Sequence, residues 1–244
     1  MNEALWHGYK KIEFEFDGKD AILVFPKTAE PGRNWLLKTE YWNAFPDAEL
    51  DLLARGFHVA YLKNETRFAT RSDCDRKAAF VSFLAKKYGL RPQCVPVGYS
   101  CGGAHAVNFA GFHPECVACL FIDAPVLNFC SYPGKLGRAD CEAVWQNEFE
   151  AAYPGVTRAQ LLHGGNHPLE KVPVLQAHRI PILMLYGTED QTVNYPENGR
   201  LLELEYAACP ELLTVIPRPL QGHHPHAGLY DRTPIAEFIW AHTH

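Results

Sequence analysis

The stretch Cys94-Val95-Pro96-Val97-Gly98-Tyr99-Ser100-Cys101-Gly102-Gly103 decides the expected fold of this chain. An apolar run ends just before Gly98, and residues 103–112 have a helix-like composition, so Ser100 falls at a sharp turn between a strand and a helix. Such a turn strains the serine backbone and leaves no room for side chains two residues to either side. The glycines at positions 98 and 102 supply that room.

The G-x-S-x-G pattern is only suggestive by itself, because composition alone produces it by chance in about one chain of this length in ten. Its context gives it weight, with a strand before it, a helix after it, and acidic and histidine residues further along the chain. The candidate function therefore depends on the order of the elements around the pattern.

Composition and charge narrow the possible classes. A chain of 244 residues with 47% hydrophobic content can bury a large core, and we expect a single domain over residues 1–244. A net charge of -5 without a basic block argues against a nucleic-acid partner. Residues 1–11 lack the apolar stretch of a signal peptide, and the longest apolar runs have strand length, so no membrane span is expected.

The eight cysteines are spaced irregularly along the chain. Without a secretory signal, this spacing favours reduced thiols and a cytoplasmic protein. The pair Cys116 and Cys119 has the C-x-x-C spacing of metal and redox sites. It opens the apolar run of a buried strand and lacks a second pair of ligands, so we interpret it as structural.

Apolar runs and helical periodicities alternate along most of the chain, which predicts right-handed crossovers and a mostly parallel sheet. Between them, residues 27–45 read as a loop leading into a helix. Residues 126–179 have weak periodicity and a possible helix at 140–152, and we expect them to form a small cap over the carboxyl edge of the sheet. Strands are predicted at 11–16, 21–25, 57–62, 94–97, 117–122, 180–186 and 212–216, and helices at 47–55, 72–88, 103–112, 197–208 and 234–242.

With Gly98-Tyr99-Ser100-Cys101-Gly102 as its nucleophile elbow, the chain resembles the α/β-hydrolase family over nearly its whole length. The resemblance implies a mostly parallel sheet of about eight strands with helices on both faces. It also implies a serine hydrolase that cleaves a carboxylic ester of a small molecule through an acyl-enzyme, without a cofactor or a metal. A serine peptidase, a thioesterase and a non-catalytic binding protein that keeps the fold remain open, as does the oligomeric state.

A serine hydroxyl needs a histidine to take its proton and a carboxylate to hold that histidine. In the family the acid follows a late strand, which selects Asp190 within the stretch 186–193. Glu189 is its neighbour, and Asp123, at the end of the preceding strand, is the other position that such folds use. Asp190 is the first choice.

Three histidines follow the last predicted strand in Gln221-Gly222-His223-His224-Pro225-His226. The family pattern places the catalytic imidazole directly after a glycine, which selects His223, with His224 as the second choice. Successive side chains of an extended segment point to opposite sides, so His224 should face away if His223 faces the serine. His226 is expected on the substrate side. A metal site is the alternative, but adjacent histidines on one loop rarely converge on one ion without more distant ligands.

An oxyanion hole needs backbone N–H groups aimed at the substrate oxygen. The N–H of Cys101, the residue after the nucleophile, is the expected principal donor, and the resemblance assigns the second donor to Lys27 or Thr28. Aromatic side chains that could line an acyl or sugar site make a carbohydrate ester one candidate substrate, although packing in the core is favoured for any single one of them. The candidate substrate-binding residues are Trp35, Tyr41, Trp42, Phe45, Tyr99, Tyr132, Trp145, His224 and His226.

Overall fold

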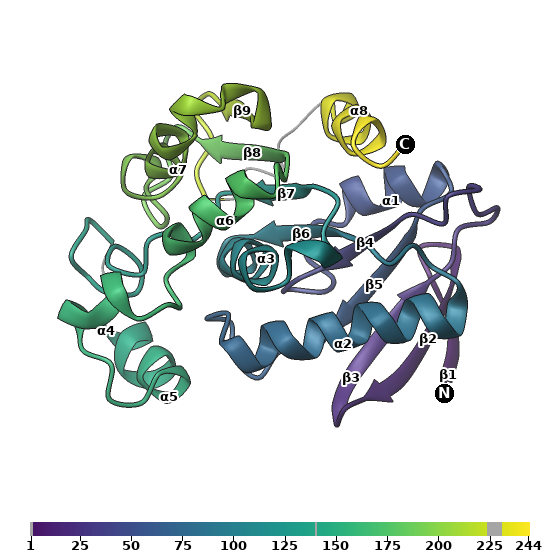
Figure 1. Cartoon of the computed structure of the whole chain (residues 1–244), viewed down its shortest axis with the longest axis horizontal. Coiled ribbons are helices and arrows are strands. Elements are labelled where there is room, and N and C mark those ends of the chain that lie inside the picture. The colour runs from purple at the N-terminus through teal and green to yellow at the C-terminus, as the bar shows by residue number, and fades with distance from the viewer. Residues whose placement is uncertain (1, 140, 224–230) are drawn as a thin grey trace.

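The computed structural model describes residues 2–139, 141–223 and 231–244. These residues form one sheet of nine strands in the order β1-β2-β3-β5-β4-β6-β7-β8-β9 (Figure 1). The strands are β1 (Asn2–Trp6), β2 (Tyr9–Phe16), β3 (Lys19–Val24), β4 (Trp35–Lys38), β5 (His58–Leu62), β6 (Val95–Tyr99), β7 (Leu120–Asp123), β8 (Ile182–Gly187) and β9 (Leu213–Arg218).

The sheet has an antiparallel edge and a parallel body. The strand β2 pairs antiparallel with β1 on one side and with β3 on the other, and β3 also pairs antiparallel with β5. From β5 onward every pairing is parallel, through β4 and β6 to β9. The carboxyl ends of six strands therefore meet at one edge, where loops build sites in such folds.

Two of these strands are absent from the sequence prediction. The strand β1 carries four exposed residues out of five, so its pattern lacks a buried face. The strand β4 is only four residues long and buried throughout, so it shows no alternation that would separate it from a loop. The prediction of a loop over residues 27–45 is therefore wrong at β4, which crosses the middle of the sheet.

Helices cover both faces of the sheet (Figure 1). The core on one face includes side chains from α2, α3, α6 and α7, and the core on the other face includes side chains from α1 and α8. The helices are α1 (Asp47–Ala54), α2 (Arg71–Tyr88), α3 (Cys101–Phe112), α4 (Glu142–Val144), α5 (Glu150–Ala152), α6 (Val172–Ala177), α7 (Gly199–Glu205) and α8 (Thr233–Ala241).

Residues 126–179 depart from the strand and helix alternation, as the sequence indicates. From α4 to α5 the chain is continuously helical, with a π-helical turn at Trp145–Phe149 between the two helices. Further along lie the short 3-10 helices Arg158–His163 and Pro168–Lys171. Side chains of this segment form a third apolar cluster with Phe68 and with Cys101 and Ala104 at the start of α3. The segment therefore packs beside the turn that carries Ser100.

Within the described ranges, no helix is both long enough and apolar enough to cross a membrane. None of the eight cysteines forms a disulfide, and only Cys209 is not buried. In the described part of the chain, no group of three or more histidine, cysteine or acidic side chains is arranged to hold a metal ion.

Candidate functional site

Ser100 lies at the turn between β6 and α3, with φ 53° and ψ -120°. Positive φ is strained for a residue with a side chain, so the surrounding contacts must hold it. The Ser100 N–H donates to the Asp123 carbonyl at 3.0 Å. A Cβ on Gly98 would lie 2.3 Å from the carbonyl oxygen of Gly102, which explains the glycine two residues before the serine.

The His223 ring bridges Ser100 and Asp190. Its Nε2 lies 2.9 Å from the Ser100 Oγ, and its Nδ1 lies 2.8 Å from the Asp190 Oδ2. Both distances fall in the hydrogen-bond range that the sequence prediction gives for a base at position 223. His224 and His226 lie outside the described residues.

The Asp190 carboxylate is buried and held by backbone donors. Its Oδ1 accepts the N–H of Thr192 at 2.8 Å and the N–H of Val193 at 2.9 Å. Its Oδ2 faces His223, and because an ionised carboxylate can only accept, the ring must donate from Nδ1. In the neutral ring Nε2 is then the acceptor, which is the form that can take a proton from Ser100.

Hydrogen bonds tie the loop after β8 to the loop after β9. The N–H of Thr188 donates to the Arg218 carbonyl at 3.1 Å, and the N–H of Glu189 donates to the Gln221 carbonyl at 2.9 Å. Leu220 donates its N–H to the Thr188 hydroxyl at 2.9 Å. The loop that carries Asp190 and the loop that carries His223 are therefore held together by hydrogen bonds.

The two alternative acids lie elsewhere. The Glu189 side chain is exposed to solvent, although its backbone joins the contact between the two loops. Asp123 is fully buried at the end of β7. Of the three carboxylates that the sequence offers, Asp190 is the one within 2.8 Å of the His223 ring.

A cavity of about 320 Å³ opens beside Ser100 and His223. Four of the aromatic residues considered from the sequence line it, namely Tyr41, Phe45, Tyr99 and Tyr132. Three further residues line the cavity that were not predicted from the sequence, namely Ala44, Arg67 and Thr192.

Arg67 follows β5 in a loop at the carboxyl edge of the sheet. That position is the signal that could have identified it, because such loops build the site.

The three candidate tryptophans do not line this cavity. Trp35 is fully buried in β4, where its Nε1 donates to the Arg91 carbonyl. Trp42 packs against Trp6 and Tyr61. Trp145 is buried in the third apolar cluster, stacked on Phe149. Their assignment to the substrate site is wrong, because an aromatic residue in a loop packs as readily into core as around a ligand.

The assignment of the second oxyanion donor to Lys27 or Thr28 is also wrong. These residues follow β3, whose last residue Val24 pairs with Val59 near the start of β5. They therefore leave the sheet at the edge opposite to Ser100, which follows the end of the parallel strand β6. The error has the same origin as the missed strand, since β4 and not β3 is the neighbour of β6.

The loop at residues 39–41, after β4, lies against the turn of Ser100 instead. The Thr39 N–H donates to the Val97 carbonyl at 3.1 Å, and the Thr39 hydroxyl lies 2.7 Å from the Gly102 carbonyl. Tyr41 has φ 53°, and its N–H makes a long contact of 3.3 Å with the Glu40 carboxylate.

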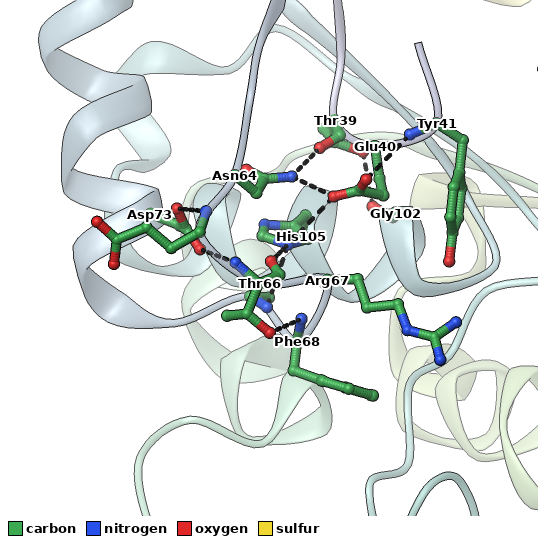
Figure 2. A network of polar contacts seen from close by, with 12 residues as sticks. Thr39, Glu40, Tyr41, Asn64, Thr66, Arg67, Phe68, Asp73, Gly102 and His105 are labelled. Carbon is green, nitrogen blue, oxygen red and sulfur yellow. Dashed lines mark hydrogen bonds and ion pairs between the residues drawn. The ribbon is translucent and has the colours of Figure 1, made fainter. Parts of the chain in front are cut away.

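Figure 2 shows the polar network behind this loop. The Asn64 amide donates to the Thr39 carbonyl at 2.6 Å and to the Glu40 carboxylate at 2.5 Å. The Asn64 oxygen accepts from the buried ammonium group of Lys77, which also contacts His105 on α3. The network ties the loop after β4 to α2 and α3.

A second buried network holds Tyr99, the residue before the serine. The Tyr99 hydroxyl donates to the Glu49 carboxylate at 3.1 Å, and the Lys38 ammonium lies 3.5 Å from the Tyr99 ring centroid. Lys38 is ion-paired with Glu49, and both side chains are almost fully buried. Burial lowers the pKa of Lys38, and the charge of Glu49 opposes that shift.

Cys101 is the first residue of α3, so its N–H has no acceptor within the helix. Its thiol is buried, and burial raises its pKa to about 11, with the charge of Arg67 acting in the opposite direction. Near pH 7 the thiolate is therefore scarce, which disfavours Cys101 as a competing nucleophile.

No protein-family model and no curated protein sequence matches the chain. Solved structures do. MPT51 from Mycobacterium tuberculosis aligns with a TM-score of 0.73 at 16% identity, covering 97% of this chain and 99% of that one. Est1E from Butyrivibrio proteoclasticus aligns with a TM-score of 0.62 at 15% identity, covering 95% and 98%.

Dipeptidyl peptidase 4 from Porphyromonas gingivalis aligns with a TM-score of 0.68 at 14% identity over 96% of this chain. This chain spans only 35% of the length of that peptidase. At these identities the similarity concerns the fold. The chain has the α/β-hydrolase fold, with a mostly parallel sheet and helices on both faces, which confirms the fold class predicted from the sequence.

Proposed function

We propose that this chain is a serine hydrolase of the α/β-hydrolase family that cleaves a carboxylic ester of a small molecule through an acyl-enzyme. The observation that carries the proposal is the bridge from Ser100 Oγ through the His223 ring to the Asp190 carboxylate, at 2.9 and 2.8 Å. A peptidase among the structural neighbours supports hydrolase activity in general, without bearing on the choice of an ester.

In the proposed reaction the Ser100 oxygen attacks the ester carbonyl carbon while His223 Nε2 takes the hydroxyl proton. Asp190 holds the ring in the required tautomer and stabilises the imidazolium that forms. The bond from carbon to the alcohol oxygen then breaks, and His223 gives its proton to the leaving alcohol. A water molecule, activated by the same ring, releases the acid from Ser100.

The negative charge that develops on the carbonyl oxygen needs donors beside Ser100. We assign this role to the backbone N–H groups of Cys101 and Tyr41. The first begins α3 and lacks an intrahelical acceptor. The second belongs to a residue whose side chain lines the cavity at Ser100, and its present contact with Glu40 is long.

We further propose that the segment 126–179 forms a cap within a single domain, because its side chains from Val126 to Leu161 pack on the start of α3, whereas α6 near its end packs on the sheet. Eight cysteines that form no disulfide favour a reducing compartment such as the cytoplasm.

The experiment compares wild type with Ser100→Ala and Asp190→Asn on p-nitrophenyl esters, acetylated sugars, an acyl-CoA and peptidyl amides. We expect ester turnover in wild type, its loss in Ser100→Ala, and a fall of about 10⁴-fold in kcat for Asp190→Asn, as in other triads. Cleavage of the peptidyl amides without any ester turnover would identify a serine peptidase, and cleavage of the acyl-CoA alone would identify a thioesterase.

A non-catalytic binding protein is the alternative from another class. A fluorophosphonate reacts with an activated serine and spares an ordinary one, so it should label wild type at Ser100 and leave Ser100→Ala unlabelled. Folded wild-type protein that resists labelling would favour the binding role.

A further inference from the structure

A second cavity, of about 690 Å³, lies next to the one at Ser100. Its walls come from residues 65–72, in the loop after β5 and the start of α2, and from residues 147–153 and 166. Arg67 lines both cavities, so this side chain lies between the two spaces. We call the larger space the outer cleft and the smaller one the inner pocket.

Arg67, between the two spaces, is joined to Glu148. The guanidinium Nε and Nη2 atoms each lie 2.6 Å from a carboxylate oxygen of Glu148, which is the geometry of a two-bond pair. In Figure 2 the Arg67 side chain extends away from the Asn64 contacts, toward the hydroxyl end of Tyr41. Burial raises the pKa of Tyr41, and a hydrogen bond from Arg67 opposes the rise. The positive charge of Arg67 is therefore already compensated.

The outer cleft presents neutral polar groups. Its side chains include hydroxyls and amides from Thr66, Thr70, Asn147 and Asn166, and its apolar side chains include those of two alanines. Among its other charged residues, Arg71 pairs with Asp75 and Glu65 pairs with Arg76. Such a lining suits a ligand with many hydroxyl groups, and it offers neither an unpaired cation cluster for phosphates nor a surface for a long alkyl chain.

The inner pocket has the opposite character, because tyrosine and phenylalanine rings surround Ser100. Aromatic rings suit the acyl part of an ester, which carries no charge and few hydrogen-bonding groups. The two cavities therefore differ in the chemistry that each suits, with aromatic rings beside Ser100 and mostly neutral polar groups on the other side of Arg67.

We propose that the outer cleft is the subsite for the leaving alcohol of the substrate, that this alcohol is neutral and rich in hydroxyl groups, such as a sugar unit, and that the Arg67–Glu148 pair is the boundary between the two subsites. This inference rests on the proposed ester hydrolysis. When the bond from the acyl carbon to the alcohol oxygen breaks, the proton from His223 goes to that oxygen, and the sugar leaves through the outer cleft.

The test places a bulky side chain in the outer cleft without touching the inner pocket. Ala151 is exposed on α5 and lines the outer cleft, so Ala151→Trp narrows it. Ala207→Trp makes the same change at an exposed site outside the residues that line either cavity. The substrates are acetylated xylobiose, which fills both subsites, and p-nitrophenyl acetate, whose leaving group is small and apolar.

We expect Ala151→Trp to lower kcat/KM about tenfold more for acetylated xylobiose than for p-nitrophenyl acetate, since several hydrogen bonds to the sugar are lost. Ala207→Trp should leave the ratio of the two substrates as in wild type. Equal effects of Ala151→Trp on both substrates would overturn the subsite. Failure of wild type to cleave any ester would instead overturn the proposed function.

A second variant tests the charge compensation. Glu148→Gln leaves the Arg67 charge without its carboxylate partner, so the site should begin to accept an anionic alcohol. We expect the ratio of activity on an acetylated sugar phosphate to that on the neutral acetylated sugar to rise about fivefold, the scale of a partly exposed ion pair. In Arg67→Gln that ratio should not rise. An unchanged ratio in Glu148→Gln would place Arg67 away from the leaving group and overturn its role as the boundary.

Discussion

A Cβ atom on Gly187 would lie 2.3 Å from the carbonyl oxygen of Gly222, closer than any real contact of this kind. The last residue of β8 therefore packs directly against the backbone that leads into His223. The acid loop begins just after the same glycine. One close backbone approach thus sets the distance between the histidine and its carboxylate.

Gly187→Ala should displace the histidine loop and leave most of the fold in place. We expect kcat to fall about 100-fold, the loss that a shift of about 1 Å can cause in a site of this kind. Gly222→Ala is the matched control, because its added Cβ would meet no atom within 4 Å. Turnover of an ester and circular dichroism separate the two effects. Full activity in Gly187→Ala would show that the loop does not depend on this contact.

His223→Ala should remove most of kcat, by about 10⁴-fold or more, because this ring alone reaches both Ser100 and Asp190 among the described histidines. His224→Ala and His226→Ala should cost far less. Rates with p-nitrophenyl acetate and fluorophosphonate labelling provide the measurement. If activity survives His223→Ala and is lost in His224→Ala, the base has been assigned one residue out of register.

Asn64→Ala should impair catalysis through the loop after β4. The amide holds Thr39 and Glu40, and with them the backbone of Tyr41 that we assign to the oxyanion hole. We expect kcat to fall about 10- to 100-fold with little change in KM, since a displaced donor acts on the transition state. A variant that loses thermal stability while its kcat at low temperature stays normal would contradict this role.

Removing one charge of the buried Lys38–Glu49 ion pair beside Tyr99 should lower the stability of the fold. Glu49→Gln leaves the Lys38 ammonium buried without its carboxylate, which we expect to lower the free energy of unfolding by about 3 kcal/mol. The double variant Lys38→Met/Glu49→Gln removes both charges and should lose less than the single one. Urea denaturation measures both. A double variant no more stable than Glu49→Gln would argue against a desolvation penalty.

Stability should fall as the pH drops below about 6.5, the ordinary pKa of histidine. Burial lowers the pKa of His58 and of His167 to about 4, and burial followed by the charge of Lys77 lowers that of His105 well below its usual value. The unfolded chain therefore binds more protons than the folded one between pH 6.5 and 4. Each histidine contributes up to about 1.4 kcal/mol per pH unit.

The measurement is the free energy of unfolding at pH 7.5, 6.5 and 5.5, which should fall by about 1 kcal/mol between the first two and by about 3 kcal/mol between the second and the third. His58→Phe removes one of the three groups and should make the decline less steep. A free energy that does not change down to pH 5 would contradict the neutral form of these rings in the folded state.

Local sequence patterns predict most of the fold and the residues that meet at Ser100. The glycines at 98 and 102, the apolar run before them and the late acidic and histidine loops are signals that depend on the covalent chain alone. Trp35 and Lys27 show where this ends. A four-residue strand buried on both faces has no periodicity, and without β4 the oxyanion loop moves to the wrong edge of the sheet.

Arg67 and Glu148 mark a second limit, because they lie 81 residues apart in sequence and meet only through tertiary packing. Nothing in either local stretch selects its partner. The presence of two cavities on either side of this pair could therefore be recognised only from the three-dimensional structure.

The seven buried thiols can be used to measure local opening of the folded protein. Burial raises the pKa of Cys74 to about 12 and that of Cys116 to about 11, so in the closed protein these sulfurs are both shielded and protonated. A thiol reagent can modify them only when the surrounding structure opens. The rate at which each cysteine is alkylated therefore measures how often its neighbourhood opens, from Cys74 on α2 to Cys130 and Cys141 in the third apolar cluster.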